Sequence, residues 1–179
     1  MKKLIAAMAA VVMMIAAFSG CSDPLAEKQS QQNTEATQAT ETPVKKAKAS
    51  DYKDNYEGLR DYFIAKDYIY IQEESKNVTE MQYKLIGAKT GHRYTMDKVT
   101  VELYEFNNGS DKLRDEIISS VKKNGYYTLY SRQIKAYVSD SEKFLMIYSD
   151  ADVKDDDTSS DAYKKMQSAI KDFKAFKGK

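Results

Sequence analysis

Large apolar and aromatic side chains recur at regular spacing only beyond residue 51, and this distribution decides which part of the chain can form a core. Residues 22–50 contain no aromatic residue and are rich in Gln, Thr, Ala, Ser, Glu and Lys. Such a segment cannot bury enough apolar surface to offset the conformational entropy that folding costs. We therefore predict one folded domain over residues 51–179, preceded by a disordered tether over residues 21–50.

The first half of this domain is expected to contain one helix and a β-hairpin. Apolar side chains at helical intervals over residues 52–66 predict an amphipathic helix, followed by a short strand at residues 68–72. Residues 79–85 match neither the helical period nor the alternation of a strand. Residues 86–96 and 98–106 are expected to form two paired strands. In the second strand, one face carries Val99, Val101 and Leu103, and the other carries Thr100, Glu102 and Tyr104.

The second half is expected to contain two helices and two or three more strands. Asn108 or Ser110 should cap the helix that follows the turn Asn-Asn-Gly, and Gly125 should end it. Thr158 with Asp161 forms part of a capping box for the last helix. The expected elements are a helix between residues 110 and 125, strands at 126–131, 132–138 and 143–149, and a helix at 159–177.

These elements predict an α+β fold, with three helices on one face of a mainly antiparallel sheet of about five to six strands. The strand at 143–149 is apolar on both faces, so it should be central in its sheet. A helix followed by up to three strands occurs twice, and Leu59-Arg60-Asp61 is echoed by Leu113-Arg114-Asp115. A duplicated α-β-β-β unit is therefore a second hypothesis for the same domain.

The N-terminus has the three-part pattern of an export signal over residues 1–20. Lys2 and Lys3 precede an uncharged run over residues 4–18, and small residues follow it. The run is shorter than the ~20 residues that a membrane-spanning helix needs. A cleaved signal peptide is thus favoured over a retained transmembrane anchor.

Phe18-Ser19-Gly20-Cys21 resembles the lipobox of bacterial lipoproteins, with Phe18 in place of the usual leucine or another aliphatic residue. The resemblance implies that Cys21 receives lipid and that the chain is cut before it. Lipid on Cys21 would hold the protein at the cell membrane, on its extracytoplasmic face. An ordinary secretory signal with a chance cysteine is the alternative. The pattern of the whole domain also looks like that of small uncharacterised lipoproteins of Gram-positive bacteria, a likeness that implies no activity.

Cysteine and histidine are too scarce for several classes of site. Cys21 is the only cysteine and His92 the only histidine, which excludes an internal disulfide, a thiolate zinc site and a His-rich metal centre. The formal net charge of +1 gives no single-sign field for binding nucleic acid. We expect no cofactor, no resident metal and no nucleic-acid partner.

Two polar clusters match known motifs only in part. The acidic segment 150–161 departs from the EF-hand loop because Lys154 stands at a ligand position and Asp155 replaces the turn glycine. A solvated loop is favoured there over weak calcium binding. The segment 87–92 has its glycines and lysine in the wrong order for a phosphate loop, so we expect a turn with His92 on the surface beside it.

Tyrosines are numerous on the predicted strands, and they are expected to pack in or around the core. If several shared an exposed face, they would instead form a binding surface. The eight residues are Tyr68, Tyr70, Tyr104, Tyr126, Tyr127, Tyr130, Tyr137 and Tyr148.

The sequence therefore favours a membrane-anchored, non-catalytic module that binds a protein or an envelope ligand. The alternative is an envelope hydrolase that uses carboxylates, with or without a cation. Two buried carboxylates that face each other in a cleft would favour the hydrolase. A flat tyrosine-rich face would favour the binding module.

Overall fold

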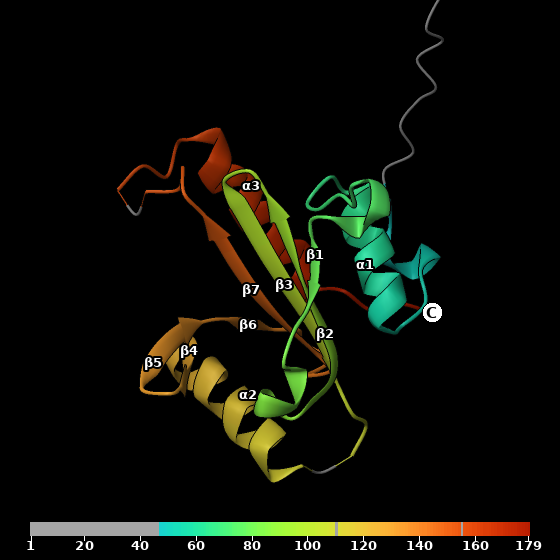
Figure 1. Ribbon diagram of the computed structural model, residues 1–179, viewed down its shortest axis with the longest axis vertical. Coiled ribbons are helices and arrows are strands. Elements are labelled where there is room, and N and C mark those ends of the chain that lie inside the picture. The colour runs from blue at the N-terminus through green and yellow to red at the C-terminus, as the bar shows by residue number, and fades with distance from the viewer. Residues whose placement is uncertain (1–46, 110, 155) are drawn as a thin grey trace, which may run out of the picture. The chain divides into compact units, whose positions relative to one another are not determined.

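Figure 1 shows the computed structural model of the chain, which describes residues 47–109, 111–154 and 156–179. This part contains three α-helices, seven β-strands and three short 3-10 helices, of which the first precedes all other elements. Their order is η1 (Ala49–Asp51), α1 (Tyr56–Ala65), η2 (Glu73–Ser75), β1 (Val78–Glu80), η3 (Tyr83–Ile86), β2 (Ala88–Met96), β3 (Val99–Phe106), α2 (Lys112–Asn124), β4 (Tyr126–Leu129), β5 (Arg132–Lys135), β6 (Tyr137–Val138), β7 (Phe144–Asp150) and α3 (Asp161–Lys174).

The main sheet has five strands in the order β1-β2-β3-β7-β6, and every neighbouring pair is antiparallel. The β2–β3 hairpin confirms the expected pairing, with one irregularity between Ala88 and Thr90. β7 lies inside the sheet between β3 and β6, as its apolar sequence predicted. β4 and β5 form a separate two-stranded sheet, and the α+β class is confirmed.

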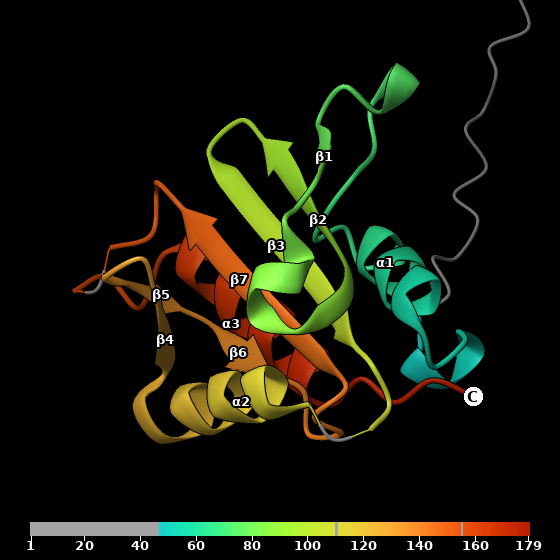
Figure 2. The same ribbon diagram turned by 60° about the horizontal axis from the view of Figure 1, so that its bottom comes forward.

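Helices cover both faces of the main sheet, whereas the sequence predicted helices on one face only. α1 and α3 pack with one set of sheet residues, and α2 packs with the opposite set together with the β4–β5 hairpin. Figure 2 shows α3 behind the sheet and α2 in front of it. We call these the α1–α3 face and the α2 face.

The central strand β3 explains this two-sided packing. Val101 and Leu103 point to the α1–α3 face, while Tyr104 and Phe106 point to the α2 face, and all four are buried. Side chains alternate along a strand, so apolar residues at both parities need a cover on each side. Glu102, which points to the α2 face of the same strand, is only 6% exposed.

The expected strand at residues 68–72 is wrong, because this segment is irregular. The side chain of Asn77 takes the place of a neighbouring strand: its Oδ1 accepts a hydrogen bond from the Gln72 N–H (2.8 Å) and its Nδ2 donates to the Tyr70 carbonyl (2.8 Å). A side-chain amide can satisfy backbone groups in this way and compete with ladder pairing. The ambiguous segment that follows contains β1 and η3.

The helix caps differ in part from the expected ones. α1 begins at Tyr56, because the Asn55 side chain accepts from the Gly58 N–H. Asp111 caps α2, three residues after Asn108 and one after Ser110, and Ser160 caps α3, two residues after Thr158. Gly125 ends α2 with a φ of 81°, which confirms the expected glycine cap.

The predicted strand at 132–138 is divided between the two sheets. β5 ends at Lys135, and the Ala136 N–H then donates to the Gly125 carbonyl (3.1 Å) before β6 joins the edge of the main sheet. Strand pairing therefore differs between the two halves of the domain, which does not support a duplicated unit. Leu59 is fully buried whereas its supposed counterpart Leu113 is exposed.

Both ends of the described domain pack on the α1–α3 face. Ala47 and Ala49 contact its core, so the packed region begins before residue 51. Phe176 is buried in the same core. The Lys179 N–H donates to the Tyr52 carbonyl (2.9 Å), and the Asp54 N–H donates to the Lys179 carbonyl (3.2 Å).

Candidate functional site

The predicted lipidation site, Cys21, lies outside the described residues, as do the expected signal peptide and most of the tether. In the part of the chain that the structure describes, no helix is long and apolar enough to cross a bilayer.

Several carboxylates of the acidic segment after β7 are engaged by other groups of the protein. Asp150 Oδ1 accepts from the Asp152 N–H (2.9 Å), and Asp152 pairs with Lys98 (3.0 Å). Hydrogen bonds from the Ser159 hydroxyl and N–H lower the pKa of Asp157. Among the residues on either side of Asp155 and elsewhere in the described chain, no group of three His, Cys, Asp or Glu side chains is placed to hold a metal ion.

His92 lies within β2, and not beside a turn as the sequence suggested. Its ring centre is 5.2 Å from that of Tyr56, and Nδ1 is buried without a hydrogen-bond partner among the described residues. Burial lowers the pKa of the imidazole. The position is that of a packed side chain under α1. Gly87 ends η3 with a positive φ, so the expected turn is limited to that residue.

Two glutamates on β3 are buried, but they point to opposite faces of the sheet. Glu105 lies on the α1–α3 face, where Oε2 accepts from the Tyr56 N–H (2.9 Å) and Oε1 pairs with Lys89 (3.0 Å). Glu102 lies on the α2 face beside Arg93. Each carboxylate thus has its own cationic partner, and the two cannot act together as a catalytic acid and base.

A cleft of about 550 Å³ opens on the α2 face of the main sheet. Its floor comes from β2, β3 and β7, one wall from β1 and η3, and the other wall from the β4–β5 hairpin. We call it the sheet cleft. It is lined by Thr79, Glu80, Met81, Gln82, Leu85, Ile86, Arg93, Glu102, Tyr104, Tyr127, Leu129, Tyr130, Ile134 and Ile147.

Most of this lining is apolar, and the floor holds one buried polar network. Arg93 donates to Glu102 Oε1 from Nε (2.8 Å) and from Nη2 (2.6 Å), and the Tyr104 hydroxyl donates to Glu102 Oε2. Both carboxylate oxygens are therefore engaged. The Arg93 side chain is still 43% exposed. A guanidinium has five N–H donors, so Arg93 can offer further hydrogen bonds to a molecule in the cleft.

The network also fixes the electrostatics of the tyrosines beside it. Burial, together with the hydrogen bond to Glu102, raises the pKa of Tyr104 far above its ordinary value. Burial and the negative charge of Glu102 raise the pKa of Tyr127 to about 12. Both phenols stay protonated at neutral pH, so they can serve as hydrogen-bond donors but not as bases.

Gly91 allows Tyr104 to lie flat on the sheet floor. A Cβ built on Gly91 would be 2.2 Å from Tyr104 Cδ1 and 2.6 Å from Cε1. Only a glycine permits this approach of ring to backbone. The glycine that suggested a turn in the sequence is thus a packing residue of the cleft floor.

The eight predicted strand tyrosines differ in burial: Tyr70 is exposed outside the cleft, and Tyr126 and Tyr137 are half-buried. Tyr68, Tyr104, Tyr127 and Tyr148 are buried, which confirms the expected core packing for these four. Tyr130 is 77% exposed at the rim of the sheet cleft. Tyrosines therefore form no broad flat face, yet three of them meet at one cavity.

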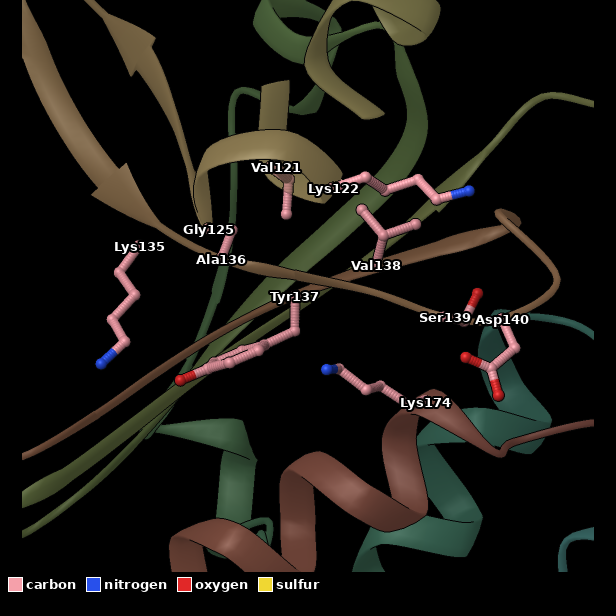
Figure 3. A pocket seen from close by; sticks show the side chains of 10 residues that line it. All are labelled: Val121, Lys122, Gly125, Lys135, Ala136, Tyr137, Val138, Ser139, Asp140 and Lys174. Atoms are coloured by element: carbon pink, nitrogen blue, oxygen red, sulfur yellow. The ribbon is translucent and has the colours of Figure 1, made fainter. Parts of the chain in front are cut away.

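A second cavity of about 500 Å³ lies along β6, between α2 and α3 (Figure 3). Lysines from separate elements line it, and Lys122 is already paired with Glu142 (2.5 Å). The buried Ser139 hydroxyl already accepts a hydrogen bond from the Phe144 N–H (3.1 Å). Long solvated lysines give little fixed geometry for a ligand, so the sheet cleft is the better candidate site.

Comparison of the chain with protein families, curated proteins and solved structures gives no match.

Proposed function

We propose that the protein is an exported lipoprotein, anchored to the membrane through Cys21, whose domain binds a small amphipathic ligand in the sheet cleft. The sequence pattern at residues 18–21 supports the anchor, and the geometry of the cleft supports the binding role. The proposed location is the extracytoplasmic face of the cell membrane.

The observation that carries the binding role is the combination of an apolar lining with one buried polar network. Ligand pockets usually have volumes of about 300–1,000 Å³, mostly apolar walls and a few fixed polar groups. The sheet cleft has this composition, with Arg93 as the accessible donor. A ligand with an apolar body and a hydrogen-bond acceptor matches it.

The structure gives the hydrolase alternative no comparable support. Glu102 and Glu105 are the only buried carboxylate residues in the described part of the chain, and the sheet separates them. We therefore do not propose carboxylate-dependent hydrolysis.

Binding can be tested with 8-anilinonaphthalene-1-sulfonate, an amphipathic fluorescent probe. Ile147 is a half-buried floor residue, so Ile147→Trp should fill the cleft and abolish saturable probe binding. Ile64→Trp is the matched control, because Ile64 is an exposed residue of α1 outside the cleft. Equal probe affinity in the wild type and in Ile147→Trp would refute binding in the cleft.

The anchor requires a separate test. Cys21→Ser removes the only thiol, so the chain should take up no fatty acid label and should remain uncut. Metabolic labelling with palmitate followed by electrophoresis checks both points. Label retained in the variant would contradict lipid attachment at Cys21.

A further inference from the structure

The turn that joins β4 and β5 has an unusual backbone for its sequence. Tyr130 and Ser131 occupy it with φ values of 48° and 62°. Two-residue hairpin turns with two positive φ angles strongly prefer Asn and Gly, because a Cβ is unfavourable there. A bulky tyrosine in this region of φ/ψ space is a genuine outlier.

Packing does not account for the tyrosine at this position. The Tyr130 side chain is 77% exposed, so its ring gains little from burial. Tyr104 and Tyr127, which line the same cleft, are only 4% and 2% exposed. The backbone strain is therefore not balanced by core contacts of the ring.

The strained residue lies at the mouth of the sheet cleft, where its ring can contact a bound molecule. Tyr130 lines the sheet cleft at the tip of its hairpin wall, together with Leu129 and Ile134. Unfavourable backbone conformations persist mainly at functional sites, where the surrounding structure imposes them. Tyrosine offers a large, rigid contact surface with little loss of side-chain entropy.

We propose that Tyr130 is a ligand-contact residue and that the ligand presents a planar ring to it at the cleft mouth. This inference rests on the proposed binding in the sheet cleft and names the chemical class of the ligand. The ring of the ligand packs against Tyr130, and its polar group is directed to Arg93. The strained turn holds the tyrosine ring at the rim before the ligand arrives.

The test separates stability from binding, because the two should change in opposite directions. Tyr130→Asn places a residue that tolerates positive φ in the turn, so the melting temperature should rise by a few degrees. The same change removes the ring, so the affinity for 8-anilinonaphthalene-1-sulfonate should fall about five- to tenfold. Tyr130→Phe should bind within about twofold of the wild type, because it keeps the ring.

Two controls define the role of the ring. Tyr70→Asn removes a half-exposed tyrosine outside the cleft and should leave probe affinity unchanged. Octane-1-sulfonate, which has no ring, should displace the probe with an affinity that Tyr130→Asn changes less than about twofold. If Tyr130→Asn lowered the affinity for octane-1-sulfonate as much as the affinity for the aromatic probe, the packing of a ligand ring on Tyr130 would be overturned.

The remaining outcomes distinguish this inference from the proposed function. Loss of probe binding in Ile147→Trp with normal binding in Tyr130→Asn would overturn the role of Tyr130 alone. Unimpaired binding in Ile147→Trp, or no saturable binding in the wild type, would overturn both. A lower melting temperature of Tyr130→Asn would show that the tyrosine serves stability, and would also overturn the inference.

Discussion

Replacing Gly91 by alanine should destabilise the domain, because the added methyl group would collide with the ring of Tyr104. The new Cβ would lie 2.2 Å from Tyr104 Cδ1, whereas ordinary contact begins at 3.4 Å, so the ring must move by roughly 1 Å. The ring is buried, and its hydroxyl donates to Glu102. The collision therefore also disturbs the polar network of the cleft floor.

The magnitude follows from three effects. Forcing an extra methyl group into a packed site costs about 1–3 kcal/mol. Weakening a buried hydrogen bond to a charged group costs about 1.5–3 kcal/mol. Alanine in place of glycine returns about 0.4–1 kcal/mol through the lower entropy of the unfolded chain. We expect Gly91→Ala to lower the free energy of unfolding by roughly 2–5 kcal/mol.

Urea denaturation of Gly91→Ala, of Tyr104→Leu and of the double variant measures this effect and its cause. Tyr104→Leu removes the ring, so Gly91→Ala should cost less than about 1 kcal/mol in that background. Two results would refute the reasoning. One is a cost below about 1 kcal/mol in the wild type, and the other is an equal cost in both backgrounds.

In urea denaturation, Glu105→Gln should lower the free energy of unfolding by about 1–3 kcal/mol, because it weakens the buried hydrogen bond from the Tyr56 N–H. Glu116→Gln changes an exposed residue and should alter the free energy of unfolding by less than about 0.5 kcal/mol. An equal loss of stability in both variants would show that the buried hydrogen bond of Glu105 does not stabilise the fold. An NMR titration of the single imidazole should place the pKa of His92 below its unfolded value of about 6.5. As the pH falls, His92 is protonated at a higher pH in the unfolded chain than in the folded one. This difference makes the free energy of unfolding decline as the pH falls below about 7. The contribution of His92 to the decline should disappear in His92→Gln. Millimolar calcium at constant ionic strength should not raise the melting temperature, and a calcium-specific rise that is lost in Asp150→Asn would count against the local contacts of the acidic loop.

The elements that the sequence predicted well are those determined by local periodicity. The β2–β3 hairpin, the helix ended by Gly125 and the last helix all carry their signal within a few residues. The α+β class follows from their order, because such elements can bury their apolar sides only against one another. Hydrogen bonds from side chains to the backbone were not predictable in this way. Asn77 replaces a strand partner for residues 70–72, and no local pattern indicates that contact.

The candidate site was missed because its parts are far apart in the chain. Arg93 and Glu102 become partners only through the register of the hairpin. The hairpin wall from β4 and β5 reaches the same cleft through tertiary packing. One signal was present in the sequence: Tyr130-Ser131 joins two short strands without the glycine or asparagine that such a turn usually contains.

Both chain ends of the described domain meet on the α1–α3 face, and the sheet cleft opens on the other side of the same sheet. A solid support or a label attached at residue 47 or residue 179 therefore lies on the α1–α3 face, which carries no part of the cleft. Immobilisation by either end should leave the cleft mouth accessible to solutes. A short affinity tag at Lys179 would nevertheless begin beside Tyr52 and Asp54, so it should be separated from the domain by a flexible spacer.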